Sequence, residues 1–155
     1  MSANPKTNSY DGDVIAWANE QARLLRTGQY NRLDIEHIAE EIEDVGISEQ
    51  RELKNRMAIL LAHLLKWQHQ PDRRGNSWRN TIRVQRKDIA KHIQKNPSLK
   101  SDLADPDWWE SAWAKALDQA TGETGFVYDR FPENCPWASE QIMNPEWMPE
   151  GSESF

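Results

Sequence analysis

Residues 33–70, LDIEHIAEEIEDVGISEQRELKNRMAILLAHLLKWQHQ, decide the fold of this chain. A helix turns about 100° per residue, so the residues that share one of its faces can be calculated. The apolar residues that lie within roughly 60° of Ile42 on the helical wheel form one stripe along the whole stretch. They are Ile35, Ile38, Ile42, Val45, Leu53, Met57, Leu60, Leu64 and Trp67. The pattern predicts one long helix, with this stripe buried against the other elements.

Gly46 lies in the middle of the stretch, and the apolar phase is the same before and after it. Two separate helices would have no reason to share a phase, so we predict that the helix continues. An interior glycine costs about 1 kcal/mol relative to alanine, which burial of the stripe can offset. The alternative is that Gly46 ends a first helix and Ser48 begins a second one. Asp34 is suited to cap the start of the long helix, and Pro71 to stop it.

Shorter patterns predict three further helices and an irregular C-terminal segment. Gly28 and Gly122 are expected to end the first and the last of these helices, and turn signals with scattered aromatic residues dominate after residue 122. The predicted helices span 11–27, 34–70, 77–95 and 106–121. The inward face of the first helix is expected to consist of Val14, Trp17, Ala18, Leu24 and Leu25.

The predicted fold class is therefore all-α. We expect a bundle of about four helices over 11–122, built around the long helix. A flexible tail, 1–10, precedes it, and the irregular segment 123–155 wraps around it, with a short helix over 139–143. The first helix and the long helix are expected to be antiparallel neighbours, because only a short loop joins them.

Composition limits the classes of protein to which the chain can belong. A length of 155 residues suits one domain with a proper core. No run of the sequence approaches the ~18 apolar residues that a membrane span requires. The N-terminus has no apolar segment typical of a secretory signal, and a single cysteine, Cys135, excludes an intramolecular disulfide. Together these features predict a cytoplasmic protein.

Charge is strongly segregated along the chain, although the net charge is only −6. Residues 71–100 carry nine Lys and Arg against two acids, whereas 101–155 carry two against twelve. Residues 34–46 add six acids and no base. Mutual attraction between packed elements explains this layout most simply. The alternative is that the basic region binds nucleic acid, against which the overall acidity argues.

Several linked segments resemble a bacterial domain-of-unknown-function family, number 29. The segments are YDGDVIAWANEQARLLRTG, LDIEHIAEEIEDVGISEQRELKNR, LLAHLLKWQHQPDRRGNSWRNTI, NPSLK, ETGF and FPENCPW. The resemblance covers residues 10–149, which is nearly the whole chain. It implies a helical bundle domain that stands alone in a small bacterial protein. It implies no activity, and it assigns no catalytic or binding residues.

The first candidate site is acidic and contains His37, Glu40 and Glu41, which share one side of the predicted long helix. An imidazole and carboxylates so spaced can share one metal ion. Di-metal sites in helical bundles, however, use a Glu-x-x-His motif on two helices. Here the order is reversed, no second copy exists, and His37 points away from the apolar stripe. A solvated face, or pairing with the basic helix, explains these acids more simply.

The second candidate site is basic and surrounds the turn after the long helix. Cations beside aromatic side chains can bind phosphate or stack on nucleobases. The candidates are Lys66, Arg73, Arg74, Arg79, Arg83, Arg86 and Lys87. The structural alternative is that Lys66 serves the negative end of the long helix and that His63 is a buried, hydrogen-bonded core histidine.

These observations favour a protein-interaction or structural module without catalytic activity, so we expect a protein partner or self-association. The alternative is a nucleic-acid-associated protein that uses the basic region. A metal-dependent enzyme that uses His37, Glu40, Glu41 and His63 is a third hypothesis. We expect no cofactor, no membrane association and no identifiable small-molecule substrate, because Gly-rich phosphate loops and catalytic motifs are missing from the sequence.

Overall fold

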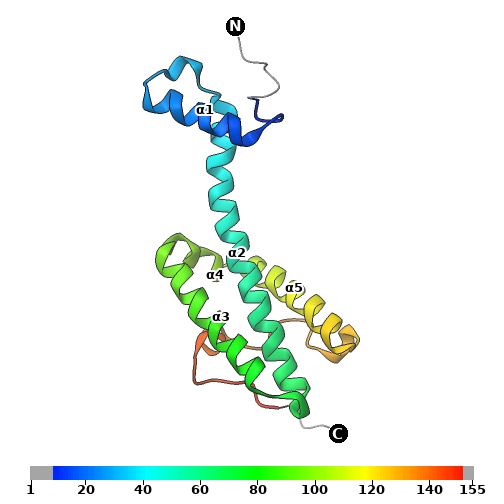
Figure 1. Cartoon of the computed structure of the whole chain (residues 1–155). Coiled ribbons are helices and arrows are strands. Elements are labelled where there is room, and N and C mark those ends of the chain that lie inside the picture. Colours follow the sequence, from blue (N-terminus) through cyan, green and yellow to red (C-terminus); the bar gives the residue numbers. More distant parts are fainter. Residues whose placement is uncertain (1–8, 152–155) are drawn as a thin grey trace. The chain divides into compact units, whose positions relative to one another are not determined.

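The computed structural model describes residues 9–151 and is entirely helical there, without strands, which confirms the all-α prediction (Figure 1). Residues 1–8 of the expected tail lie outside the described residues. The α-helices are α1 (Val14–Arg26), α2 (Ile35–His69), α3 (Asn76–Lys95), α4 (Lys100–Leu103), α5 (Pro106–Thr124) and α6 (Ser139–Met143). Single 3₁₀ turns lie between them, η1 (Tyr30–Arg32), η2 (Pro71–Arg73), η3 (Pro97–Leu99) and η4 (Tyr128–Arg130).

The chain divides into two compact units within α2. The first unit ends at Ser48, and the second begins at Glu49. The predicted organisation, one bundle over 11–122 and an irregular segment over 123–155, stays a prediction. The first unit contains α1 and the N-terminal half of α2, whereas the second contains the C-terminal half of α2 and everything after it.

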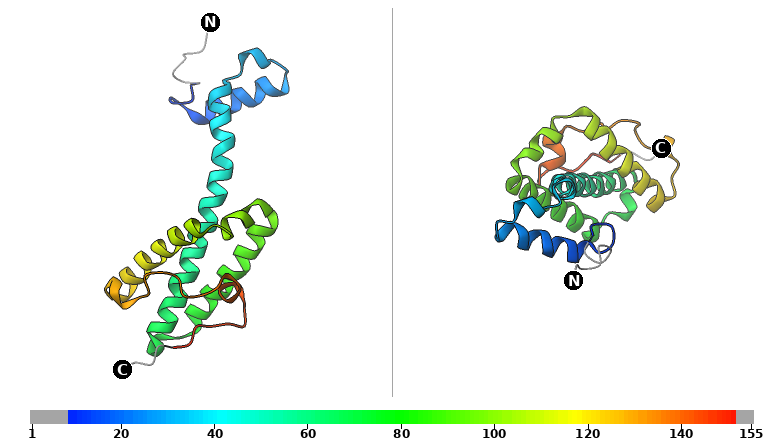
Figure 2. Two further views of the ribbon diagram at one scale, coloured as in Figure 1. Left: turned by 180° about the vertical axis from the view of Figure 1, so that it is seen from behind. Right: turned by 90° about the horizontal axis from the view of Figure 1, so that it is seen from above.

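In the first unit, α1 crosses the start of α2 steeply, as Figures 1 and 2 show, so the predicted antiparallel arrangement of these two helices is wrong. The Asp13 side chain caps α1 by accepting hydrogen bonds from the backbone N–H groups of Ile15 and Ala16. Gly28 has a φ of 74°, a left-handed conformation that glycine adopts without strain. Trp17 and Leu24 are buried as predicted. The predicted inward face was wrong for Val14, Leu25 and Ala18, which are exposed.

Helix α2 is continuous from Ile35 to His69, so the prediction of one helix through Gly46 is confirmed. The alternative, a break at Gly46 with a new start at Ser48, is wrong. A Cβ atom added at Gly46 would meet nothing within 4 Å, so this glycine does not serve close packing within the chain. The helix tolerates it because the cost of an interior glycine, about 1 kcal/mol, is small beside the burial in its C-terminal half.

The predicted apolar stripe is buried in only one half of α2. Its C-terminal part, which we call the core stripe, consists of Leu53, Met57, Leu60, Leu64 and Trp67. The first four are 0% exposed, and Trp67 is 7% exposed. In the N-terminal part, Ile38 is partly buried. The other three residues, Ile35, Ile42 and Val45, which we call the exposed stripe, are 65%, 67% and 65% exposed. Burial of the whole stripe was therefore a wrong prediction.

The side of α2 that α1 contacts explains this difference. Asp34, His37 and Glu41 lie about 80–140° from Ile42 on the helical wheel, outside the stripe. The Trp17 indole donates to the Asp34 carboxylate at 2.9 Å, and the Gln21 amide oxygen accepts from the Asp34 backbone N–H at 2.7 Å. Polar contacts thus fix α1 on a flank of α2, and the exposed stripe stays uncovered.

In the second unit, α3 and α5 lie on either side of the C-terminal half of α2 (Figure 1). Their inward faces meet the core stripe in one apolar cluster, which includes Ile82, Ile89, Ala112 and Trp113. Leu60, Leu61, Leu64 and Leu65 on α2 are all 0% exposed, so α2 is enclosed on most sides here. The sequence here, MAILLAHLL over residues 57–65, is apolar on almost every side, which is typical of a helix buried on most sides.

Helix α5 extends three residues beyond its predicted end. The expected stop, Gly122, is helical, and α5 ends at Thr124. Gly125 forms the C-cap with a φ of 75°, and its N–H donates to the Thr121 carbonyl. A left-handed C-cap favours glycine, so the helix ends at Gly125. Gly122 can remain helical because a glycine inside a helix reduces helix stability by only about 1 kcal/mol relative to alanine.

The C-terminal segment crosses α2 on its way from α5 to α3, as Figure 2 shows on its left side in orange to red. Phe131 and Ile142 are 5% and 0% exposed and belong to the apolar cluster of the second unit. The short helix predicted over 139–143 is α6. Over residues 123–151, the segment packs on the second unit. Residues 152–155 of the predicted segment lie outside the described residues.

Candidate functional site

The predicted acidic site lies in the first unit, where its members bond to α1 and to the turn before it. The His37 Nδ1 lies 2.7 Å from an Asp34 carboxylate oxygen, and the His37 ring stacks on Tyr10 with centroids 4.2 Å apart. This hydrogen bond is the main reason why the pKa of His37 is raised. Burial opposes the shift at Asp34, but the bonds from His37 and Trp17 lower the pKa of its carboxyl.

Tyr10, which the sequence placed in the tail, donates its hydroxyl proton to Glu41. That bond, more than burial or nearby charge, raises the pKa of Tyr10 to about 12. Glu40 is exposed. The structure therefore engages His37 and Glu41 in separate contacts with Asp34 and Tyr10, and it does not gather His37, Glu40 and Glu41 around one point.

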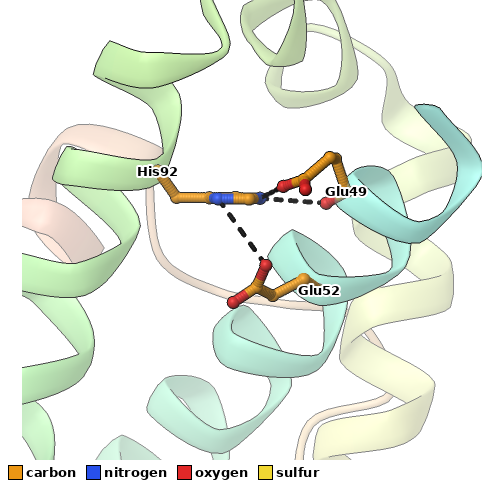
Figure 3. Close-up of side chains that lie close together, drawn as sticks. All are labelled: Glu49, Glu52 and His92. Atoms are coloured by element: carbon orange, nitrogen blue, oxygen red, sulfur yellow. Dashed lines mark hydrogen bonds and ion pairs between the residues drawn. The ribbon is translucent and has the colours of Figure 1, made fainter. Parts of the chain in front are cut away.

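Within residues 9–151, a group with metal-ligand character appears at a different place. Glu49 and Glu52 on α2 and His92 on α3 offer ligand atoms that all lie within 4.8 Å of one another. Figure 3 shows the His92 ring extending toward α2, with Glu49 at one ring nitrogen and Glu52 at the other. The Nε2 atom lies 3.0 Å from the Glu49 carbonyl oxygen and 3.2 Å from its carboxylate, and Nδ1 lies 3.8 Å from the Glu52 carboxylate.

One imidazole and two carboxylates are a donor set that suits zinc or manganese. Other groups compete for them here. Arg56 donates to Glu52 at 3.0 Å and to Asp88 on α3 at 3.2 Å, and Lys91 and Lys95 line the same hollow. Arg56 bonds the Oε1 atom of Glu52, whereas the Oε2 atom faces His92. The arrangement works best as an ionic tie that holds α3 against α2.

Sequence analysis missed this cluster because its members are some 40 residues apart. His92 lies about 60° from Ile89 on the wheel of α3, so a face toward the core could have been expected. No pattern in the sequence indicates that Glu49 and Glu52 lie opposite it. That pairing depends on how α2 and α3 pack.

The first member of the basic site, Lys66, lies near the end of α2, beside Trp78 at the start of α3. Lys66 is buried, with its Nζ 2.5 Å from the Glu123 carboxylate and 5.2 Å from the Trp78 ring centroid. His63 donates from Nδ1 to the Ile59 carbonyl, and burial lowers its pKa. Lys66 and His63 therefore contribute to the packing of the second unit.

The arginines beside this turn surround Trp67. The guanidinium groups of Arg74 and Arg79 lie 5.2 Å and 5.1 Å from its ring centroid. Arg74 also donates from Nε to the Trp67 carbonyl at 2.6 Å. Arg73 is exposed. Cation–π contacts of this kind contribute about 0.5–2 kcal/mol, so Arg74 and Arg79 stabilise the turn.

On α3, Arg86 is 5% exposed and differs from its neighbours Arg83 and Lys87, which are exposed. Arg86 donates from Nε to the Ile142 carbonyl and from Nη2 to the Trp147 carbonyl, both at 2.7 Å. Burial lowers the pKa of this guanidinium, which nevertheless stays charged. Arg86 thus fixes the C-terminal segment to α3.

Cys135 is half-buried, and its thiol lies 3.6 Å from the Trp137 carbonyl oxygen. Burial raises the pKa of this thiol, which makes it a poorer nucleophile. Over residues 9–151, no helix combines the length and the apolar character that crossing a membrane demands.

Comparison with known proteins identifies the family and nothing more specific. No curated protein and no solved structure matches the chain. Residues 9–148, nearly the whole chain, match the family described as Domain of unknown function DUF29. The expected resemblance is confirmed, and the chain belongs to the DUF29 family.

Proposed function

We propose that this protein is a bacterial, cytoplasmic protein-interaction module that binds its partner through the exposed stripe of α2. The observation that carries this proposal is the exposure of Ile35, Ile42 and Val45, about two thirds each, on one face of a well-formed helix. Single exposed apolar residues are ordinary, but a continuous apolar patch with a polar border is typical of an interaction site.

The border of the stripe supports the proposal. Glu36, Glu41 and Glu43 lie about 100–120° from Ile42 on the helical wheel, on both sides of the stripe. Such a face, apolar in the middle and acidic along its edges, suits a helix or groove with an apolar centre and basic edges. The groups that could perform chemistry, Lys66 and Cys135, are instead bonded inside the second unit.

A photo-crosslinking experiment in the host cell tests the proposal. A photoreactive amino acid replaces Ile42 in one variant and Asp44 in a matched control, because Asp44 is exposed on the opposite side of the same helix. We expect a discrete adduct from position 42 and none of that mass from position 44. Equal labelling at both positions, or no adduct at position 42, would contradict the proposal.

A second candidate function is nucleic-acid binding through α3. Its supporting observation is that Arg83 and Lys87 are exposed and that no ion pair between described residues engages either of them. Binding of DNA or RNA that weakens steeply between ~50 and ~200 mM salt would favour it. Absence of binding at ~50 mM salt would remove it.

A further inference from the structure

A groove of about 650 Å³ runs between α3 and the C-terminal segment in the second unit. Its apolar lining consists of Ile82, Ala90, Met143, Pro145 and Met148. Methionine side chains adapt their shape to apolar ligands. We call this hollow the α3 groove. Its size lies within the range of sites that bind small apolar surfaces.

Four cations belong to the lining of the α3 groove. They are Arg79, Arg83, Arg86 and Lys87, against one acid, Glu146. No ion pair between described residues involves any of the four cations. Arg86 is the strongest case, because it is 5% exposed and its described hydrogen bonds go to two neutral carbonyl groups. A buried cation without a counter-charge favours an acidic ligand.

The exposed stripe has the complementary character, with isoleucine and valine in its middle and glutamates along its edges. Two copies of the exposed stripe would bind each other poorly, because Glu36, Glu41 and Glu43 would then face acids of the other copy. The exposed stripe therefore requires a basic counterpart. The α3 groove offers one on every molecule of this protein.

We infer that the protein self-associates by docking the exposed stripe of one copy into the α3 groove of a second copy. This inference rests on the proposed function and names its partner. Because the two surfaces differ, the contact is heterologous, and it either closes as a reciprocal dimer or continues as an open chain. Apolar residues supply the contact area, and the glutamates and the groove cations set its specificity.

Charge exchange between copies provides the test, measured as molar mass by light scattering over a range of protein concentrations. The stripe variant carries Glu36→Lys and Glu43→Lys, and the groove variant carries Arg83→Glu and Lys87→Glu. All four residues are exposed, so both variants should fold. We expect the wild type to form multiples of 18.0 kDa. Each variant alone should associate at least about tenfold more weakly, since like charges then meet at every contact.

An equimolar mixture of the two variants should recover the association. In the mixture, the lysine-bearing stripe of the stripe variant meets the glutamate-bearing groove of the groove variant. The unchanged stripe of the groove variant meets the unchanged groove of the stripe variant, as in the wild type. A matched control carries Glu40→Lys and Asp44→Lys, which change the net charge equally on the opposite side of α2. This control should associate like the wild type.

A monomeric wild type at millimolar concentration would overturn the inference, and so would two variants that associate as well as the wild type or a mixture that stays monomeric. The photo-crosslinking experiment separates these failures from failure of the proposed function. An adduct at position 42 with a different protein, together with a monomeric wild type, would leave the proposed function standing and remove this inference.

Discussion

The two halves of α2 carry the same apolar phase and have opposite surroundings. In the C-terminal half, Leu53, Met57, Leu60 and Leu64 are 0% exposed because α3, α5 and the C-terminal segment enclose them. In the N-terminal half, Ile35, Ile42 and Val45 are about two thirds exposed. The comparison teaches that an apolar stripe indicates a surface suited to burial. It does not indicate whether another part of the same chain or another molecule buries it.

The largest expected effect comes from truncating the core stripe. Leu60→Ala should reduce the free energy of unfolding by about 2–5 kcal/mol, since Leu60 is fully buried and a cavity remains. The matched change in the exposed stripe, Ile42→Ala, should alter it by no more than about 0.5 kcal/mol in dilute protein. Chemical denaturation followed by circular dichroism measures both. Equal losses would mean that the two halves do not differ in burial.

A smaller effect should follow from removing the contact that holds the cover over the core. Arg86→Met leaves the Ile142 and Trp147 carbonyl groups without their donor, at a cost of about 1–3 kcal/mol. Hydrogen–deuterium exchange should then accelerate in residues 139–148. Arg83→Met, three residues earlier and exposed, is the control and should leave that exchange unchanged. If both variants behave alike, Arg86 does not fix the segment.

Gly46→Ala should stabilise α2 by up to about 1 kcal/mol, because the residue is helical and an added Cβ meets nothing within 4 Å. Gly125→Ala should destabilise the second unit by a similar amount, since its φ of 75° is strained for alanine. Thermal unfolding curves of both variants provide the measurement. Destabilisation by Gly46→Ala would indicate that something approaches α2 closely at this point.

The smallest effect concerns pH and the contact between α1 and the start of α2. Because the pKa of His37 is raised above its ordinary value of 6.5, protonated His37 stabilises the α1–α2 contact at pH values below 6.5. This contribution is lost as pH rises through the raised pKa. Because the pKa of Asp34 is lowered below its ordinary value of 3.8, ionised Asp34 stabilises the same contact at pH values above 3.8. This contribution is lost as pH falls through the lowered pKa. The α1–α2 contact should thus be firmest between about pH 4 and 6.5.

The Trp17 indole N–H, which bonds Asp34, reports this contact by NMR. Its exchange with solvent should be slowest within that window and should quicken on either side. Salt should reduce the effect, because His37 and Asp34 are each about one-third exposed. In the Asp34→Asn variant, the exchange rate of the Trp17 indole N–H should no longer depend on the titration of His37. Persistence of the same profile in this variant would assign the effect to other groups, such as Glu40 or Asp11.

Much of the fold followed from local chemistry. The phase of the stripe predicted a continuous α2, and the 139–143 helix was predicted at its observed bounds. The predictions of burial failed where contacts between residues far apart in the sequence determine which side chains are covered. The exposed stripe has the same sequence pattern as the core stripe, and only the polar anchoring of α1 through Trp17 and Gln21 leaves it uncovered. Gly122 and Gly125 are both plausible helix ends, and backbone geometry selects Gly125.

The candidate sites were harder to predict than the fold. Lys66 and Arg86 were predicted as possible contacts for an anion or nucleic acid, and the sequence did not indicate their bonds within the chain, to Glu123 and to two backbone carbonyl groups. The His92 cluster escaped notice because its partners come from another helix. Residue type and helical phase indicate which groups face inward, but long-range packing determines what each group meets there.

Hydrogen–deuterium exchange along α2 of the wild-type protein, measured across a wide range of protein concentrations, tests the central claim most directly. We predict that amides near the core stripe are strongly protected at every concentration. Amides of residues 35–47 should exchange quickly in dilute protein and become protected as concentration rises, since a second copy then covers the exposed stripe. Protection of residues 35–47 that is strong and independent of concentration would contradict the account.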